Sequence, residues 1–559
     1  MLQLFNRGMH YISAIATLVI TVLLSVEFVF ATSIENQQLF FVWHFWILLY
    51  LSIDISVRLL FRKVFPASIL RRVVNLLVLV PFGAKFLLGL EISDMYGAVQ
   101  LIFALIVLVR LEDIGRVINM LRVQPTQLFV LGFLVLIFIG ALLLSLPVAR
   151  TGEAALPFLD AVFTATSALC VTGLVLHDVG AYFSGFGQGV ILLLIQLGGL
   201  GIMTFYALMV LVLGSKVSRS QSIEYQNALA TEGVGETFAL IKSIFMYTFI
   251  VEIVGAGLLF LVWKDGFSSM GEAIVMSVFH SISAFCNAGF SLFSDSLSSF
   301  ATTYSVLGIM AGLIIVGGIG FPVIFNLRNH YFKRTQERLK VQTKLPLLIT
   351  LILIVSGTLV LYVVERHGVL MDYTLPQQMM LSFFHSVSAR SAGFNALDMG
   401  HFSVASLLVI TVLMFIGSSP GSTGGGIKTT TFGIIHVALL RVIQGDTKMS
   451  IFGRSLSTLN VYRALSIFFI SVIIVFTGLF SLLLNEAYGF VPLMFEAVSA
   501  FGTTGLSTGI SSGLSSIGKV SIISLMFIGR LGPLTLGIAL AKRKQQANYA
   551  FPEEQILLG

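Results

Sequence analysis

The sequence predicts an all-α polytopic membrane protein in which four similar units surround one pore, preceded by about four additional transmembrane helices. Three observations predict this fold class. The composition is 57% hydrophobic and 11% charged, with a mean hydropathy of +0.97. About twelve apolar runs are long enough to cross a bilayer. Four glycine-centred segments, each between two of these runs, repeat one another.

The composition also excludes several classes of protein. A chain this apolar cannot present a wettable surface as a soluble globule. The net charge of +7 comes from basic residues in short loops between apolar runs, where anionic lipid accounts for them. We therefore expect membrane lipid around the chain and no nucleic-acid partner. Two cysteines predict no disulfide framework, and a first apolar run long enough to span the bilayer predicts no cleavable signal.

The apolar runs and the basic residues together predict a topology. The predicted spans lie near residues 9–32, 39–61, 73–90, 97–118, 127–149, 187–213, 238–263, 303–326, 345–364, 403–443, 461–484 and 516–541. The basic clusters are Arg62, Lys63, Arg71 and Arg72; Arg116 and Arg122; Lys216 and Arg219; Arg328 to Lys344; Arg441 to Arg463; and Lys542 to Lys544. All six clusters fall on one side if both termini are cytoplasmic, which leaves the four repeated segments outside.

The repeated segments read FTATSALCVTGL, FHSISAFCNAGF, FHSVSARSAGF and FEAVSAFGTTGL. Their glycines are Gly173, Gly289, Gly393 and Gly505, and a Ser-Ala pair precedes each. Each segment is headed by an apolar stretch too short to cross the membrane, which predicts a half-helix that descends and an extended strand that returns. The predicted unit is therefore a span, a half-helix, a loop and a second span.

Four such loops meeting on one axis predict a cation filter. Irregular backbone is tolerated at membrane depth only where it lines water or is buried in protein. Segments centred on glycine can turn successive carbonyl oxygens inward, and rings of carbonyls replace the hydration shell of a monovalent cation. The half-helices would also aim their negative C-terminal ends at that cation. The expected filter residues are Val171, Thr172, Gly173, Asn287, Ala288, Gly289, Ser391, Ala392, Gly393, Thr503, Thr504 and Gly505.

Glycine in membrane helices more often serves close helix packing, and for a single glycine that interpretation is favoured. Four glycines at matched positions after matched Ser-Ala pairs favour the filter instead. Asp178, Asp295 and Asp398 follow three of the glycines by five or six residues and predict an acidic mouth that concentrates cations.

Other polar residues recur at matched positions in the segments. Cys170 and Cys286 each stand three residues before a glycine, and we interpret them as small residues near the filter rather than as a metal pair. Histidines occupy one position in the second and third copies, and other residues replace them in the first and fourth. This variation predicts a hydrogen-bonding scaffold rather than a catalytic or metal site. The four residues are Thr164, His280, His385 and Glu496.

The stretch SSPGSTGGGIKTTT, residues 418–431, superficially suggests a phosphate-binding loop. The match fails because Ile427 separates the last glycine from Lys428 and because the flanks are membrane-like. Proline and clustered glycines cannot sustain a helix, so the sequence predicts an irregular loop beside a wet cavity within the membrane.

The four segments, together with GSSPGSTGGGIKTTTF, GRLGPLTLGIAL and a terminal PEEQILLG, resemble the Trk/Ktr/HKT superfamily of potassium-transport membrane subunits. The Ktr branch is the most similar in these motifs, and the likeness covers roughly residues 125–559. It implies four M1–P–M2 repeats, similar to those of potassium channels, around one pore. It also implies a homodimer with two separate pores in the plasma (inner) membrane. A cytoplasmic ring of RCK/KTN-type nucleotide-binding subunits would control opening.

The resemblance also implies roles for particular residues. A glycine at 173, where sodium-preferring members carry serine, implies potassium as the substrate. Residues 418–428 match the family's intramembrane gate loop, and Arg530 resembles the arginine that faces it. The gate residues implied are Gly421, Gly424, Gly425, Gly426, Lys428 and Arg530. No cofactor is expected on this chain, and nucleotide is expected on the regulatory partner only.

The chain departs from the family pattern in two places. The third copy is one residue shorter between Ser388 and Gly393, and it carries Arg390 behind the filter. Residues 1–122 add about four spans. They faintly resemble a voltage sensor but lack its dense arginines, so we interpret them as a packing or assembly domain. The predicted domains are residues 1–122, then repeats at 123–235, 236–340, 341–455 and 456–559, the last with a cytoplasmic tail.

Three classes of function are open to a chain with these features. A gated, channel-like uptake pore would be driven by the membrane potential. An ion-coupled symporter, with sodium or protons, is the alternative, but it predicts inverted repeats and intramembrane carboxylates, whereas the copies here are parallel. An enzyme would need a convergent nucleophile, metal or acid–base set, and the sequence offers none.

Overall fold

The computed structural model describes residues 125–152, 156–213, 234–332, 338–445 and 450–533, together with Gly537. Within these ranges the regular secondary structure is helical apart from one short hairpin, β1 (Ser450–Ile451) and β2 (Arg454–Ser455). The expectation of a predominantly helical chain with apolar helices is confirmed for this part of the protein. The first four predicted spans, Lys216, Arg219 and Lys542 to Lys544 lie outside the described residues.

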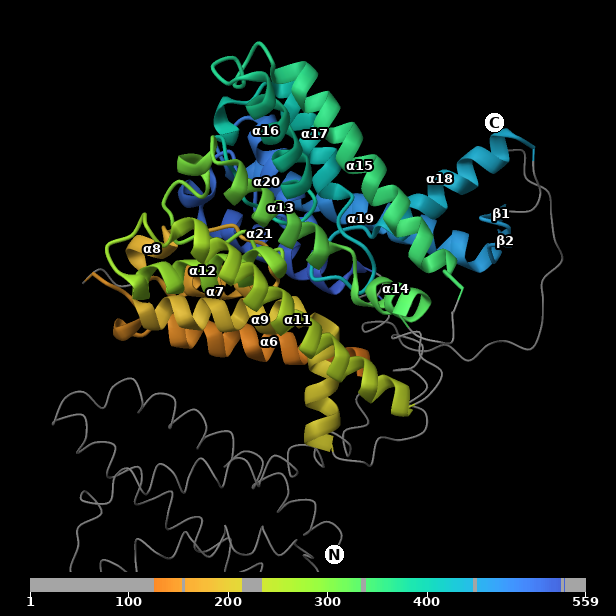
Figure 1. The fold of residues 1–559 in the computed structure, drawn as a ribbon, viewed down its shortest axis with the longest axis horizontal. Coiled ribbons are helices and arrows are strands. Elements are labelled where there is room, and N and C mark those ends of the chain that lie inside the picture. Colours follow the sequence, from red (N-terminus) through yellow and green to blue (C-terminus); the bar gives the residue numbers. More distant parts are fainter. Residues whose placement is uncertain are drawn as a thin grey trace, which may run out of the picture.

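The helices follow one order four times (Figure 1). A long helix comes first: α6 (Pro125–Leu144), α11 (Val234–Trp263), α15 (Val341–Glu365) and α19 (Thr458–Asn485). A half-helix follows it: α7 (Phe158–Leu169), α12 (Met270–Phe285), α16 (Leu375–Ser388) and α20 (Phe490–Gly502). A last helix, often broken, ends each unit: α9 (Gly185–Leu213), α13 (Tyr304–Gly318) with α14 (Phe321–Phe332), α17 (Val404–Phe415) with α18 (Thr429–Ile443), and α21 (Ser516–Leu531).

Short helical turns lie in the loops that join the half-helices to the last helices. They are α8 (Val179–Tyr182), η3 (Ser298–Phe300), η4 (Met399–His401) and η5 (Ser511–Gly513), and a further turn, η2 (Pro147–Ala149), precedes α7.

Long apolar helices account for only part of the predicted spans. Among the described residues, Lys242–Trp263, Val341–Glu365 and Thr458–Asn485 are each long and apolar enough to cross a membrane. All three belong to the first helix of a unit. Helices α13 and α14 pass the same test only as a pair that is bent by 90°. The predicted second spans at 303–326 and 403–443 each consist of two helices, and the break in the third unit coincides with the irregular loop expected within residues 418–431.

Glycines explain where the last helices break. Gly201 has φ 54° and kinks α9, and Gly320 has φ 95° at the bend between α13 and α14. In the third unit residues 416–428 separate α17 from α18, and in the fourth Gly532 ends α21 with φ 82°. Positive φ is open to glycine at little cost, whereas other residues rarely adopt it. Hydropathy alone does not reveal these breaks because the glycines lie within apolar sequence.

Small residues bring the first and last helices of each unit together. A glycine in each first helix, Gly140, Gly255, Gly357 or Gly478, faces a side chain of the last helix so closely that an added Cβ would contact it within 3.0 Å. Those facing side chains are Leu194, Leu313, Leu413 and Leu525. Helices in a bilayer gain little from apolar burial against one another, so close packing at small residues stabilises their association.

The outer faces of the long helices remain apolar. Ile253 of α11 is 69% exposed and Phe476 of α19 is 67% exposed. Such surfaces are suited to contact with lipid tails, which agrees with the composition.

The close approach of α21 to α20 supplies a test of this packing. A Cβ on Gly529 would overlap the backbone carbonyl oxygen of Phe501, the last turn of the half-helix. We expect Gly529→Ala to lower the free energy of unfolding by about 1–3 kcal/mol, because the backbone must move apart. Thermal unfolding of the purified protein in detergent measures this. Gly312→Ala in α13, where nothing lies within 4 Å of an added Cβ, is the matched control and is expected to leave stability unchanged or slightly raised. Equal stability of the two variants would contradict the packing.

Candidate functional site

The four glycines predicted from the repeated segments meet in a closed ring. A Cβ built on Gly173 would collide with the carbonyl oxygen of Ala288, which directly precedes Gly289. The same relation holds from Gly289 to Ala392, from Gly393 to Thr504, and from Gly505 back to Thr172. Each glycine therefore contacts the carbonyl that precedes the next glycine, and the fourth segment returns to the first. The contacts leave no room for a side chain at any of the four positions.

All four segments share one backbone conformation. The glycines have φ values of 91°, 70°, 78° and 90° in chain order. The residue two positions earlier also has positive φ, namely Val171 at 56°, Asn287 at 58°, Ser391 at 67° and Thr503 at 47°. These residues are not glycines, so the surrounding contacts must hold them in a conformation that they would otherwise avoid. The expected filter residues thus lie together, in four equivalent backbones.

The serine of each Ser-Ala pair ties the half-helix to its own loop. In the first and fourth units Ser167 Oγ and Ser499 Oγ accept the backbone N–H of Gly173 and Gly505, both at 3.1 Å. In the second unit Ser283 Oγ donates to Phe290 O at 2.7 Å. Ser388 Oγ donates likewise to Phe394 O at 2.5 Å. These buried hydrogen bonds explain why the pair recurs beside each glycine.

The shorter third segment reaches the same conformation by a tighter turn. Ala392 N and Gly393 N both donate to Ser388 O, at 3.0 and 3.3 Å. Arg390 lies behind this segment, 6% exposed, and its Nη2 donates to Thr350 Oγ1 of α15 at 3.1 Å. The missing residue is therefore absorbed at the end of α16 and does not displace Gly393 from the ring.

Oxygen atoms dominate the chemistry at the ring. The segments contribute main-chain carbonyls, and the hydroxyls of Thr172, Thr503 and Thr504 are buried without a hydrogen-bond partner among the described residues. Within the same part of the chain no group of three or more His, Cys, Asp or Glu side chains is arranged to hold a metal ion. Cys170 and Cys286 are buried and form no disulfide. Neutral oxygen donors of this kind suit a weakly hydrated monovalent cation rather than a transition metal.

A cavity of about 460 Å³ lies on one side of the ring. All four glycines line it, together with the predicted acidic residues Asp178, Asp295 and Asp398. The carboxylates also cap nearby turns, because Asp178 accepts from Ala181 N at 3.0 Å, Asp295 from Ser299 N at 2.7 Å and Asp398 from Gly400 N at 2.9 Å. These bonds hold the three carboxylates at the cavity wall.

The residues predicted to form a scaffold make hydrogen bonds on the half-helices. Thr164 Oγ1 donates to Asp160 O at 2.9 Å, and the Nδ1 atoms of His280 and His385 donate to Met276 O and Leu381 O at 2.8 and 2.9 Å. Glu496 accepts from Ser507 and Ser511.

The glycine-rich stretch passes beneath the ring on its other side. Thr423 Oγ1 donates to Phe285 O at the end of α12, and Ser419 N donates to Gly318 O of α13. Gly424 lies against Ser391, and a Cβ on Gly425 would overlap the side chain of Thr503. Residues 418–428 therefore contact three of the four ring units directly.

Two basic side chains hold this stretch in place. Lys428 Nζ donates to Gly424 O at 2.6 Å and so folds back on its own loop. Arg530 of α21 donates to Thr423 O in the loop and to Gly198 O in α9. The arginine thus joins the loop to the first and fourth units. A cavity of about 300 Å³ is lined by Gly421, Gly424, Gly426, Lys428 and Arg530, which are five of the six predicted gate residues.

Comparison with known proteins identifies the family. A family model described as TrkH, cation transport protein, matches residues 122–550. The chain belongs to this family. The resemblance to the Trk/Ktr/HKT superfamily is thereby confirmed, and the chain is a membrane protein of cation transport.

Individual relatives agree with this assignment. The Ktr system potassium uptake protein B of Bacillus subtilis is 39% identical over 79% of this chain and 99% of its own length. The potassium/sodium uptake protein NtpJ of Enterococcus hirae is 36% identical over 78% of this chain and 98% of its own. The crystal structure of the potassium transporter TrkH from Vibrio parahaemolyticus has the same fold, with a TM-score of 0.59 at 18% identity over 88% of this chain and 98% of that one.

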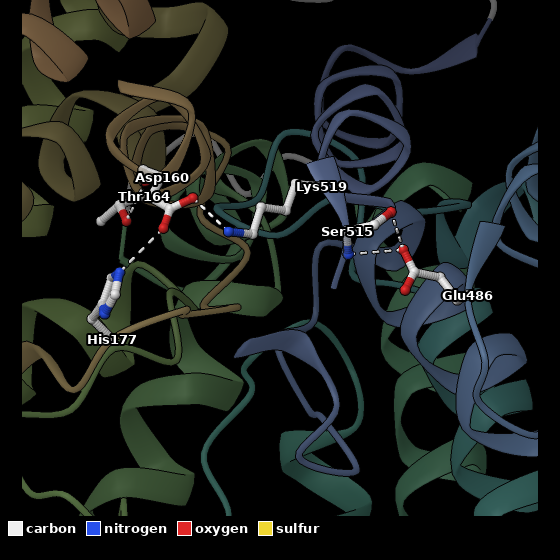
Figure 2. A network of polar contacts seen from close by, with 6 residues as sticks. All are labelled: Asp160, Thr164, His177, Glu486, Ser515 and Lys519. Atoms are coloured by element: carbon white, nitrogen blue, oxygen red, sulfur yellow. Dashed lines mark hydrogen bonds and ion pairs between the residues drawn. The ribbon is translucent and has the colours of Figure 1, made fainter. Parts of the chain in front are cut away.

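A further contact in this TrkH-family chain, between the first and last units around the ring, is an ion pair that was not predicted from the sequence. Lys519 Nζ of α21 lies 2.6 Å from Asp160 Oδ1 of α7, and His177 Nε2 lies 3.3 Å from Asp160 Oδ2 (Figure 2). The pair joins the first unit to the fourth. The sequence does contain a signal for this pair, because charged residues in apolar segments usually pair. The two charges are a carboxylate in the first turn of a half-helix and a lysine in the first turn of the last helix.

This ion pair supplies a second test. The Asp160 side chain is 7% exposed and the Lys519 side chain 17%. Removal of one partner leaves a nearly buried charge, so we expect Asp160→Asn to lower the free energy of unfolding by about 3–5 kcal/mol. Asp160→Asn with Lys519→Met removes both charges and should recover most of that loss. Thermal unfolding in detergent distinguishes the two, and a single variant as stable as the double variant would contradict the assignment.

Proposed function

We propose that this chain takes up potassium across the plasma membrane through a gated, channel-like pore driven by the membrane potential. The observation that carries the proposal is the closed ring of four glycines, each against the carbonyl that precedes the next. Flow down the electrical gradient is worth about 2.3 kcal/mol per charge for every 100 mV, so uptake needs no covalent chemistry. The names of the relatives, which include potassium uptake proteins, support potassium as the substrate.

Selectivity in this proposal arises from the ring. Carbonyl oxygens held by a rigid backbone replace the hydration shell of potassium more completely than that of sodium. Residues 171–173, 287–289, 391–393 and 503–505 form the filter, and the acidic cavity in front of it concentrates cations. The serine hydrogen bonds behind each segment keep the oxygens at fixed spacing.

Gating in this proposal is the movement of residues 418–428. The loop lies below the ring and is tied to it by hydrogen bonds, and Arg530 links it to α9 and α21. Retraction must break these bonds, so a cytoplasmic partner that pulls on the flanking helices can control flow. Lys428 adds a positive barrier to cations while the loop is in place. We propose that this partner is a nucleotide-binding regulatory ring of the RCK/KTN type.

The remaining architecture is part of the same proposal. Four M1–P–M2 repeats, at 123–235, 236–340, 341–455 and 456–559, surround one pore, and two chains form a homodimer with two pores. Both termini are cytoplasmic. The family match begins at residue 122. Residues 1–122 form an additional membrane domain for packing or assembly.

Ion-coupled symport remains the alternative, and one observation favours it. Glu252 of α11 is 5% exposed within a transmembrane helix, close to Gln196 and Cys286. Intramembrane carboxylates of this kind carry coupling ions in secondary transporters. Reversal potentials in reconstituted vesicles distinguish the two mechanisms, because that of a channel-like pore follows the potassium gradient alone, whereas that of a symporter also shifts with the sodium or proton gradient.

The filter assignment predicts a loss of selectivity on substitution of its glycines. A side chain on Gly393 or Gly505 would collide with Thr504 O or Thr172 O and shift the ring oxygens. We expect Gly393→Ser and Gly505→Ser each to reduce the ratio of potassium to sodium uptake about tenfold or more, since one tenfold step needs only about 1.4 kcal/mol. Uptake in cells that lack other potassium systems measures this ratio. Gly312→Ala serves as the control, and unchanged selectivity in both filter variants would count against the assignment.

The gate assignment predicts the opposite change, a gain of flux. Deletion of residues 421–426 removes the segment below the ring, so we expect higher potassium flux without the regulatory partner. Arg530→Gln, which weakens the bonds to Thr423 and Gly198, should raise flux to a smaller extent. Flux into proteoliposomes measures both, with dimer content checked by size exclusion. A fully assembled deletion variant with reduced flux would refute the gate.

A further inference from the structure

A second layer of hydrogen bonds lies behind the outer end of the filter. In the second unit His280, nine residues before the glycine, lies with its Nε2 3.0 Å from the hydroxyl of Ser291, two residues after the glycine. In the fourth unit Glu496 occupies the same place and accepts from Ser507, again two residues after the glycine. The half-helix therefore supports its own loop through a matched pair of side chains in both units.

The fourth unit differs because its supporting side chain is a carboxylate. Glu496 is 0% exposed. Its two oxygens accept from Ser507 Oγ and from Ser511 Oγ, the latter at 3.1 Å, and a backbone hydrogen bond from Thr508 reaches the same carboxylate. Three donors around two oxygens partly offset the cost of burying this carboxylate.

The fourth unit also differs at the cavity wall. The first three units place Asp178, Asp295 and Asp398 there, five or six residues after their glycines. Six residues after Gly505 the chain has Ser511 instead, which lines the same cavity and donates to Glu496. The fourth unit therefore has its carboxylate, Glu496, behind the cavity wall, joined by a hydrogen bond to the wall residue Ser511.

We propose that Glu496 is the fourth carboxylate of the outer cavity. It holds the loop of residues 505–511 through Ser507 and Ser511, and its charge acts through these hydroxyls to raise the affinity of the cavity and the outer filter for the entering cation. Glu496 is a positioning residue, since it does not itself line the cavity. The inference rests on the proposed function and adds the source of cation affinity in the fourth unit.

The decisive variant removes the negative charge of Glu496 but keeps a side chain that can hydrogen-bond to the loop. Glu496→His keeps a ring nitrogen for Ser507, as His280 has for Ser291, and removes the negative charge. We expect the KM for potassium uptake to rise about 3- to 10-fold while the maximal rate and the ratio of potassium to sodium uptake change less than twofold, because the lost attraction acts on entry. Adding Ser511→Asp to this variant restores an acid at the wall and should return the KM to the wild-type value.

A matched control lies in the same unit. Glu486 also accepts from a serine, since Ser515 N and Ser515 Oγ donate to it at 3.0 and 2.6 Å at the start of α21 (Figure 2). It lies outside the residues that line the cavity, so Glu486→Gln is expected to leave the KM unchanged. A KM that stays at the wild-type value in Glu496→His would overturn the proposal.

A gain-of-function variant covers the case in which Glu496→His does not assemble. His280→Glu places a carboxylate behind Ser291 in the second unit and should lower the KM, and an unchanged KM would equally overturn the proposal. Failure of the proposed function is distinct from either outcome, because the wild-type chain would then show no potassium uptake.

Discussion

Closure of a ring by four backbone segments is the constraint on which the rest of the structure depends. Each ring glycine contacts the carbonyl that precedes the next, and the fourth returns to the first. One side chain at any of these positions would force two segments apart. The half-helices, the serine bonds behind them and the Asp160–Lys519 pair all hold the segments at this spacing.

The membrane explains why so many bonds converge on these loops. Backbone that is neither helix nor closed sheet loses its hydrogen bonds to water at this depth, so protein groups must supply them. The serines do so for the ring segments, and Arg530 with Lys428 does so for residues 418–428. The same bonds hold residues 418–428 in one defined position against the ring segments.

Much of this arrangement could be predicted from the sequence because it is repeated. Four copies of one motif indicated the ring glycines and the serines beside them, and the three aspartates beyond them indicated the acidic cavity. The broken helices could not be predicted from hydropathy, since Gly201, Gly320 and Gly532 interrupt the helix without interrupting the apolar run. The Asp160–Lys519 pair joins residues far apart in the chain, and only the folded ring brings them together. The role of Glu496 depended on seeing that Ser511 faces both the cavity and the carboxylate.

The most direct test of the ring is to locate the ion itself. Crystals of the protein grown with rubidium or thallium, which substitute for potassium and scatter anomalously, would show where the cation is held. The account predicts anomalous density on the axis between Gly173, Gly289, Gly393 and Gly505, within coordination distance of the carbonyls at 172, 288, 392 and 504. Density bound elsewhere in the membrane region, for example beside Glu252, with none inside the ring, would contradict it.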